Sequence, residues 1–253
     1  MTLFGMEGRT DAPEVLAAFE VDYTPSAVAV QLVLALDELT TLDTSLCLCP
    51  AAGSGVWARA LRAVFGPWRG HPTPVIVGVD IRESERVNLA RACNHVAIGD
   101  IKTLYGTVLD DGLGLVIDNP PFTAFSSYWP TMILDYGWLS PDAVVAFYGL
   151  SSWGQSAEAA PHLARWCPDL QIRVGGRIAH RGTGAADARE YSLWVWSVAG
   201  YRERKRAGLR RPDWRTHQLP ALPASMRRWS PAAVPGTYPI EPGLVTEIRE
   251  RFL

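Results

Sequence analysis

Lysine is scarce in this sequence, and long apolar runs are missing from it. The 24 basic residues comprise only two lysines, Lys102 and Lys205, and 22 arginines, a bias that we attribute to a GC-rich genome and not to function. No run of about 18 apolar residues exists, which argues against a membrane span. The first ten residues lack the basic-then-apolar layout of a secretory signal. We therefore expect a cytoplasmic protein that does not bind a membrane.

Cysteine is also sparse, with four residues at positions 47, 49, 93 and 167. Cys47 and Cys49 alternate on a predicted strand, so both side chains point to one face and lie too close along the strand for an easy disulfide. The sequence has no second CxxC-like pair and no histidine pair at the spacing of a zinc site. We predict no metal site and interpret the cysteines as small buried apolar residues.

The composition is that of a soluble globular protein, because 48% of the residues are hydrophobic and 20% are charged. A chain of 253 residues can bury one large core, or one core and a small appendage. We expect residues 1–200 to form the main domain and residues 201–253 to form a basic, proline-rich C-terminal extension.

The charge of the chain is unevenly distributed. The net charge is −2, but residues 201–228 carry nine basic and two acidic residues, a net charge of +7, which leaves −9 on the remainder. A basic segment on an acidic body is typical of a protein that contacts a polyanion such as nucleic acid, with Arg202 and Arg206 as candidate contacts. A solvated tail explains the same charges equally well.

Short apolar runs alternate with helical patterns along most of the chain. The predicted helices are 26–39, 56–65, 84–93, 127–138 and 157–166. The predicted strands are 44–49, 75–80, 95–99, 113–118, 143–149, 171–179 and 191–198. This alternation predicts an α/β, Rossmann-like fold with an open, mostly parallel, seven-stranded sheet. The short link 181–189 predicts an antiparallel strand pair at one end.

The tetrapeptide Asn119-Pro120-Pro121-Phe122 is the most informative motif of the chain. It must end the predicted strand 113–118, because proline cannot donate to a β-ladder and fixes φ. The rigid turn presents an amide side chain, a proline carbonyl and an aromatic ring in one small volume. Two acceptors and a stacking ring suit a planar amino group, so the turn predicts a site for a substrate NH₂.

Glycine and aspartate residues follow the neighbouring strands. Pro50-Ala-Ala-Gly-Ser-Gly55 is a tight loop that opens a helix, and its glycines allow close approach of a ligand to the backbone. Asp80 can accept both hydroxyls of a ribose, and Asp100 can accept an adenine amino group. Each aspartate alone is also typical of a turn or cap. Their joint placement at the carboxyl ends of parallel strands favours a nucleoside site.

Together these motifs resemble the gamma class of S-adenosylmethionine-dependent DNA amino-methyltransferases over residues of about 22 to 198. Residues 119–122 are similar to the catalytic (D/N/S)PP(Y/F) motif, Tyr23-Thr24-Pro25 to the (Q/Y)TP element, and residues 49–55 to the (D/E)PxxGxG loop. The resemblance implies the Rossmann-like class I methyltransferase fold and the cofactor S-adenosyl-L-methionine. The residues that it implies at the cofactor are Tyr23, Thr24, Pro25, Pro50, Gly53, Gly55, Asp80, Asp100 and Asn119.

Cys49 departs from the family pattern. The family has an acid at this position that contacts the ammonium group of the cofactor, and a thiol cannot supply that charge. Another acceptor, such as a backbone carbonyl, must therefore replace it.

A second resemblance concerns residues 177–196, which are similar to the late motif of phage and plasmid adenine methyltransferases, where a glycine-rich loop leads into an aromatic strand. It implies that the loop lies beside the base pocket and that Tyr191 is a second stacking residue. We interpret Trp194 and Trp196 as core residues. A phage-encoded protein of this kind would act in the host cytoplasm.

The implied reaction is the methylation of the exocyclic N6 of adenine in DNA, as in restriction-modification. The Asn119 side-chain oxygen and the Pro120 carbonyl accept the two N–H groups and localise the nitrogen lone pair, and Phe122 stacks on the flipped base. The nitrogen then attacks the methyl group directly, so positioning and fixed dipoles supply the rate. The sequence identifies no base for the released proton.

Two alternatives stay open at this point. The first is the same chemistry on an RNA base or a protein glutamine amide, because NPP(Y/F) occurs in those families also. The second is a catalytically inactive protein that binds the cofactor or nucleic acid, for which Cys49 is the only support. Recognition of a duplex DNA site is expected to be relaxed, confined to a few bases, or supplied by a partner. A homodimer and a separate specificity subunit are both left open.

Overall fold

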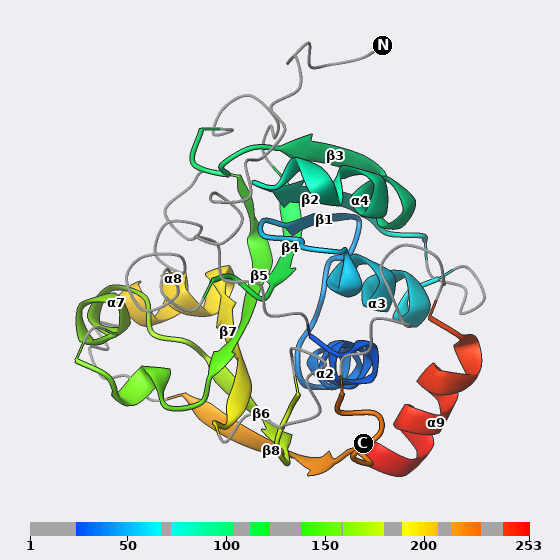
Figure 1. The fold of residues 1–253 in the computed structure, drawn as a ribbon. Helices are drawn as coiled ribbons and strands as arrows, with labels where there is room; N and C mark the ends of the chain where they lie inside the picture. Colours follow the sequence, from blue (N-terminus) through cyan, green and yellow to red (C-terminus); the bar gives the residue numbers. More distant parts are fainter. Residues whose placement is uncertain are drawn as a thin grey trace.

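The structure, a computed structural model, describes residues 24–66, 72–103, 112–121, 138–157, 159–179, 189–206, 214–228 and 240–253. Within these ranges the centre is a sheet of eight strands in the order β3-β2-β1-β4-β5-β7-β6-β8 (Figure 1). The strands are β1 (Leu46–Cys49), β2 (Val75–Asp80), β3 (His95–Ile98), β4 (Leu113–Asp118), β5 (Leu139–Leu150), β6 (Leu170–Gly175), β7 (Tyr191–Ser197) and β8 (Arg215–Ala221). The helices are α2 (Ser26–Leu39), α3 (Val56–Val64), α4 (Arg86–Ala92), α7 (Ala160–Arg165), α8 (Val198–Arg206) and α9 (Pro242–Phe252), with 3₁₀ turns η2 (Glu83–Glu85) and η3 (Trp153–Gln155).

The strand directions confirm the predicted mostly parallel sheet. Strands β1 to β5 run parallel to one another, and β1 lies between β2 and β4. Strand β7 runs antiparallel to both β5 and β6, as the short link before it predicts. The prediction of seven strands is wrong by one, because β8 adds a further parallel strand beside β6. The sequence did not predict β8, since RTHQLPA is polar and Leu219 is its one buried residue.

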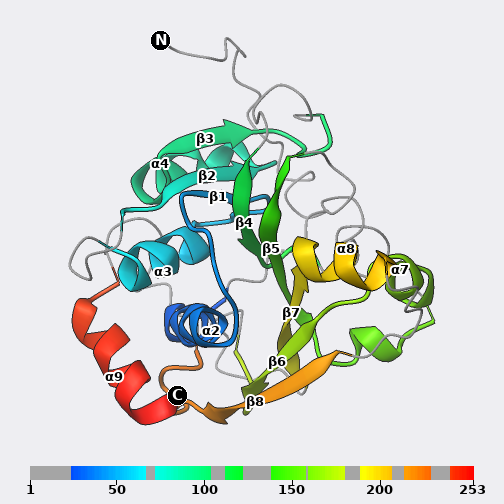
Figure 2. The same ribbon diagram turned by 180° about the vertical axis from the view of Figure 1, so that it is seen from behind.

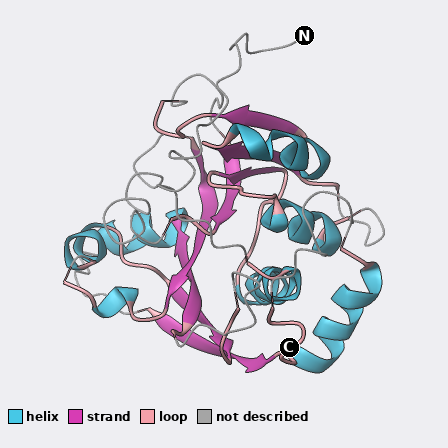
Figure 3. Cartoon of the chain, in the orientation of Figure 1, coloured by secondary structure: helices cyan, strands magenta, loops and turns pink. Residues whose placement is uncertain are grey.

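Helices cover both faces of this sheet. Helices α2, α3, α4 and α9 lie on one face and α7 and α8 on the other (Figures 1 and 2), and Figure 3 shows the strands as one layer between them. The sheet curves around α2, which is apolar on nearly all sides and buries ten residues from Ala27 to Leu36. A helix that is hydrophobic all round belongs inside a core. Two apolar clusters result, one on each face.

The predicted bounds agree with the structure where the hydrophobic pattern is strong. The helix 26–39 and the strands 75–80 and 113–118 begin and end as predicted. Strand β5 begins earlier than predicted, at Leu139, and β6 ends earlier, at Gly175. The next residue, Gly176, has a φ of +76°, which a strand cannot continue. The predicted helix 127–138 lies outside the described residues, apart from Trp138.

The C-terminal residues add to the layers of the core. Besides β8, residues 242–252 form α9, which packs against α2 and α3. The Gln31 side chain on α2 donates from Nε2 to the Pro220 carbonyl at 3.0 Å and to the Phe252 carbonyl at 3.1 Å. This contact ties both C-terminal elements to the buried helix.

The helices that the structure describes are all too short or too polar to cross a bilayer. In the same residues no group of histidine, cysteine, aspartate and glutamate side chains has the arrangement needed to hold a metal ion.

Candidate functional site at the carboxyl ends of β1, β2 and β4

The candidate site lies where the strand order reverses. Strand β1 is flanked by β2 on one side and β4 on the other, so the chain leaves the sheet in opposite directions from this point. In open α/β sheets, ligands bind in the crevice outside the carboxyl ends of the strands at such a switch point. The loop 50–55 follows β1, Asp80 is the last residue of β2 and Asn119 follows β4, so all three lie at the strand ends that the sequence predicted.

The glycine loop is held against β2 by its backbone. The Ala52 N–H donates to the Val79 carbonyl at 2.8 Å, and the Gly53 N–H donates to Asp80 Oδ2 at 2.8 Å. Gly53 and Gly55 have φ angles of +53° and +83°, which other residues rarely adopt. A Cβ at Gly55 would lie 2.7 Å from the Cβ of Ala92. The loop therefore requires glycine for its conformation and for its close approach to α4.

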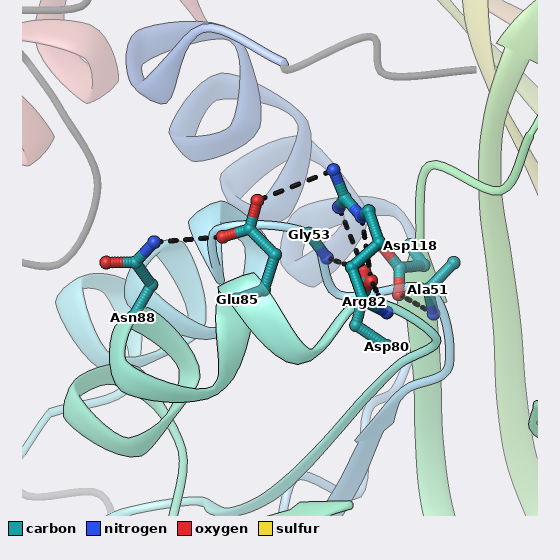
Figure 4. A network of polar contacts seen from close by, with 7 residues as sticks. All are labelled: Ala51, Gly53, Asp80, Arg82, Glu85, Asn88 and Asp118. Atoms are coloured by element: carbon teal, nitrogen blue, oxygen red, sulfur yellow. Dashed lines mark hydrogen bonds and ion pairs between the residues drawn. The ribbon is translucent and has the colours of Figure 1, made fainter. Parts of the chain in front are cut away.

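Asp80 is bound by protein groups on every side (Figure 4). Oδ1 accepts the backbone N–H and the Nε–H of Arg82 at 2.9 Å each, and Oδ2 accepts Nη2 of Arg82 at 3.1 Å in addition to Gly53. Arg82 also lies 3.4 Å from Glu85, which accepts the Asn88 amide at 2.9 Å. A carboxylate has about four lone-pair sites. The predicted contact of Asp80 with a ribose therefore requires Arg82 to give up bonds.

Asp118 is a second buried carboxyl group at the same loop. Its Oδ2 accepts the Ala51 N–H at 2.6 Å and its Oδ1 accepts the Asn119 N–H at 2.8 Å, while the residue is 1% exposed. Burial raises the pKa of Asp118 to about 7, although these two backbone hydrogen bonds oppose the shift. Asp118 was not among the predicted site residues; the signal that the sequence offers for it is an acid at the end of an otherwise apolar strand.

Asn119 and Thr24 meet across 95 positions of sequence. Asn119 Nδ2 donates to the Thr24 hydroxyl at 3.3 Å, and Thr24 is 2% exposed. This bond orients the amide so that Oδ1 faces away from Thr24. The predicted TP element and the predicted catalytic turn therefore lie together, with Pro120 buried beside them.

The remaining predicted cofactor residues lie at or near the strand ends. Pro50 and Pro25 are buried, next to β1 and α2 respectively. Asp100 follows β3 and accepts the Lys102 N–H at 3.0 Å, which is the turn role that the sequence left open for it. Ile81, which the sequence analysis did not single out, is 42% exposed beside Asp80 and offers an apolar surface to a ligand. Tyr23 and Phe122 lie outside the described residues.

Of the predicted substrate residues, Tyr191 lies at this edge, where it pairs with Leu150 at the end of β5, but its side chain is buried. Tyr191 is 1% exposed in the core, with its ring stacked on Tyr148 at 5.4 Å, so it has no face for a base. Helix α8 follows β7, whose end at Ser197 pairs with Val144 early in β5, at the opposite edge of the sheet. Arg202 on α8 is exposed there. The side chain of Arg206 lies outside the described part of the chain.

The interpretation as buried apolar residues is confirmed for three of the four cysteines and for both tryptophans, whereas Cys167 is only half-buried. Cys47, Cys49 and Cys93 are buried and all four cysteines are reduced thiols. Burial raises the pKa of the Cys49 thiol well above its usual range, so it carries no charge near neutral pH. Trp194 and Trp196 are each 1% exposed and lie in the cluster on the α7 face.

Comparison with known proteins supports the fold. No family model and no curated protein matches the sequence. Among solved structures, a Listeria monocytogenes protein assigned to the class I S-adenosylmethionine-dependent methyltransferases is 13% identical, with a TM-score of 0.53, over 83% of this chain and 68% of that one. The M protein of the type I restriction enzyme EcoKI is 13% identical, with a TM-score of 0.47, over 73% of this chain and 45% of its own.

A protein from Pyrococcus horikoshii assigned as an RNA methyltransferase is 16% identical, with a TM-score of 0.48, over 73% of this chain and 95% of its own. At such identities the likeness concerns the fold and not the substrate. The chain therefore has the α/β, Rossmann-like fold of the class I S-adenosylmethionine-dependent methyltransferases.

Proposed function

We propose that this protein is an S-adenosylmethionine-dependent N-methyltransferase that modifies the exocyclic N6 of adenine in duplex DNA. One observation carries the proposal: Asn119 and Pro120 follow β4, next to the glycine loop that follows β1, and the Asn119 amide is oriented by Thr24. An amide oxygen and a main-chain carbonyl are thereby held near the place where the fold binds a ligand.

The residues present fit S-adenosylmethionine by charge and shape. The carboxyl groups of Asp80 and Glu85 face the guanidinium of Arg82 (Figure 4), and Arg59 adds a second guanidinium at the Ser54 carbonyl and near Glu85. Asp118 forms no ion pair with an arginine in the described residues, so it is the carboxyl group that suits a cationic ligand. S-adenosylmethionine has a sulfonium and an ammonium against one carboxylate. The loop with Gly53 and Gly55 admits the methionine part, and when bound this cofactor supplies the methyl group.

The adenosine part is proposed to lie toward β2 and β3. The exposed Ile81 offers a surface for the adenine ring, and Asp100, one strand further on, can accept its amino group. Asp80 holds the glycine loop in place through Gly53. It binds the ribose hydroxyls only when Arg82 yields at least one of its hydrogen bonds.

The catalytic turn prepares the target nitrogen. The Asn119 Oδ1 atom and the Pro120 carbonyl each accept one N–H of the adenine amino group, which localises the nitrogen lone pair. Thr24 keeps the amide of Asn119 from rotating. Since neither acceptor is charged or forms a covalent bond, the residues act by positioning and by preorganised dipoles. Phe122 is proposed to stack on the flipped base.

DNA is favoured as the substrate by the order of the sequence motifs and by the basic segment 201–228. Arg202 and Arg206 on α8 are proposed to contact the DNA backbone away from the flipped base, because α8 begins at the opposite edge of the sheet. Their contribution should be salt-dependent and insensitive to sequence.

The decisive experiment is methyl transfer from labelled S-adenosylmethionine to duplex DNA, RNA and protein in parallel, followed by mass spectrometry of the digested products. N6-methyladenine in DNA is the expected product. Methylated RNA or glutamine without methylated DNA would show that the substrate is RNA or protein. No transfer to any substrate would refute the proposal that the protein is a methyltransferase.

Asn119→Ala should abolish the transfer, because it removes one of the two acceptors. The matched control is Asn94→Ala, whose side chain is exposed and accepts the Ile76 N–H at 2.9 Å at the other end of β2. It should remain active. Unchanged activity in Asn119→Ala would contradict the assignment of the catalytic turn.

A further inference from the structure

We infer that Asp118 is the residue that binds the ammonium group of the cofactor, in place of the acid that Cys49 lacks. The inference rests on the proposed function, since it concerns the same cofactor. It replaces the expectation that a backbone carbonyl takes this role.

The position of Asp118 relative to Cys49 supports this assignment. Strands β1 and β4 pair in parallel, with Leu48 opposite Val116, so the register places Cys49 opposite Ile117 and Pro50 opposite Asp118. Asp118 thus stands one step further along, beside the first residue of the glycine loop. Its Oδ2 accepts the Ala51 N–H at 2.6 Å, which brings the carboxyl group to the base of that loop.

The charges around Asp118 leave it without a cation of its own. Among the described residues, Asp80, Arg82, Cys49 and Cys93 act electrostatically on it or are affected by it. Burial raises the pKa of both thiols, so neither is charged near neutral pH. Arg82 is bound to Asp80 and Glu85, and no ion pair to Asp118 is formed in the described part of the chain.

An unpaired carboxyl group is costly to bury in its charged form. The two backbone N–H groups satisfy about half of its lone-pair sites and leave acceptor capacity on both oxygens. A ligand ammonium at the glycine loop would supply both the missing positive charge and the missing donors. Asp80 cannot take this role as readily, because Arg82 and Gly53 already fill its acceptor sites.

The inference predicts that cofactor binding releases a proton. Burial holds the pKa of Asp118 at about 7 without ligand, and an adjacent ammonium must lower it. At a pH below 7 the ligand therefore has to displace the carboxyl proton. Affinity should rise by up to about tenfold per pH unit between about pH 5.5 and 7 and then level off.

The test is isothermal titration calorimetry on the full wild-type chain with S-adenosylhomocysteine, which retains the ammonium but lacks the sulfonium. Titrations in two buffers of different ionisation enthalpy count the protons. We expect about 0.9 proton released per ligand at about pH 6 and about a quarter of a proton at about pH 7.5, below the pH at which the ligand's own amino group titrates. The same release is expected with S-adenosylmethionine, and none with methylthioadenosine, which lacks the ammonium.

Two variants distinguish the effect of Asp118 on ligand binding from that of another carboxylate. Asp118→Asn should lower the affinity for S-adenosylhomocysteine about 10- to 100-fold at about pH 7.5 and abolish the proton release. Asp142→Asn, which alters an exposed residue early in β5, should leave both unchanged. Circular dichroism would verify that Asp118→Asn is folded, and the wild-type titration decides the question if it is not.

The outcomes distinguish this inference from the proposed function. Wild-type protein that binds S-adenosylhomocysteine with no proton release, or with the same release after Asp118→Asn, would overturn the role of Asp118 and leave the cofactor intact. Proton release with S-adenosylmethionine alone would assign the carboxylate to the sulfonium and overturn the inference. Wild-type protein that binds none of these ligands would refute the proposed function itself.

Discussion

Asn119 Nδ2 lies 3.3 Å from the hydroxyl oxygen of Thr24, so a residue just before α2 orients a side chain that follows β4. Both groups are polar and Thr24 is 2% exposed, which makes the bond a stable constraint. A side-chain amide can rotate about its last bond unless a neighbour distinguishes its oxygen from its nitrogen. The Thr24 hydroxyl, which can donate or accept, accepts from Nδ2 in this structure, and the bond limits rotation of the Asn119 amide.

Thr24→Val should therefore lower kcat about 10- to 100-fold, because the amide of Asn119 loses its orientation while its chemistry is unchanged. Thr24→Ser keeps a hydroxyl and should restore most of kcat. Steady-state kinetics with DNA, together with a separate measurement of Kd for S-adenosylmethionine, would test this. If Thr24→Val raised Kd and left kcat unaltered, Thr24 would be a cofactor contact and not a positioning residue.

Gly55→Ala should destabilise the protein and weaken cofactor binding. The residue has a φ of +83°, and a Cβ there would lie 2.7 Å from the Cβ of Ala92. The backbone conformation alone should cost about 1–3 kcal/mol in the free energy of unfolding. Gly243→Ala is the control, because a Cβ at Gly243 in α9 meets nothing within 4 Å. Urea denaturation should show equal or greater stability for that variant, and a similar loss in both would contradict the local argument.

The ion pair between Arg82 and Asp80 should contribute far more to stability than its exposed neighbour. The two side chains are 10% and 5% exposed, whereas Arg86 in its pair with Glu83 is 49% exposed. Arg82→Ala leaves two buried carboxylates without the guanidinium that pairs with them and should cost about 3–5 kcal/mol.

Arg86→Ala should change stability by less than about 1 kcal/mol, since exposed pairs contribute little. Chemical denaturation of both variants in the same buffer would measure the two losses in the free energy of unfolding. Equal losses would mean that the Asp80 network is as well solvated as the surface pair.

The main features of the fold could be predicted because local pattern and tertiary role agree. Residues 26–39 form a helix both in pattern and in structure, and the two prolines after Asn119 end β4 as proline must. The proximity of Thr24 to Asn119 followed from the motifs and not from periodicity. Strand β8 could not be predicted, since its polar sequence pairs at an edge where no buried face imposes alternation.

The electrostatics of the site were less predictable than its location. That Asp80 ends a strand is visible in the sequence, but its ion pair with Arg82 depends on side-chain geometry. Tyr191 is a second example, because its predicted contact with a base is not possible in the structure. An aromatic residue after a glycine-rich loop suggests base stacking, yet its place in β7 against Tyr148 buries it. Sequence spacing does not determine which face of a strand an aromatic ring occupies.

Asp118 should make the stability of the ligand-free protein fall as the pH rises. Its folded pKa is about 7, above the value of about 3.9 for an unfolded aspartate. Because the folded pKa is raised, the contribution of Asp118 is fully present below about pH 4 and is lost as the pH rises through 7. The loss should be ~4 kcal/mol at most, on the scale of about 1.4 kcal/mol per pKa unit.

Asp118→Asn cannot ionise, so the difference in unfolding free energy between this variant and the wild type isolates the effect. The groups whose pKa is lowered, Asp43 and Glu83, titrate at lower pH and are present in both proteins. Urea denaturation between about pH 5 and 8 should therefore show the wild type losing stability relative to the variant, with the difference constant above pH 8. A difference that does not vary with pH would mean that Asp118 is ionised throughout, which requires a cation beside it even without ligand.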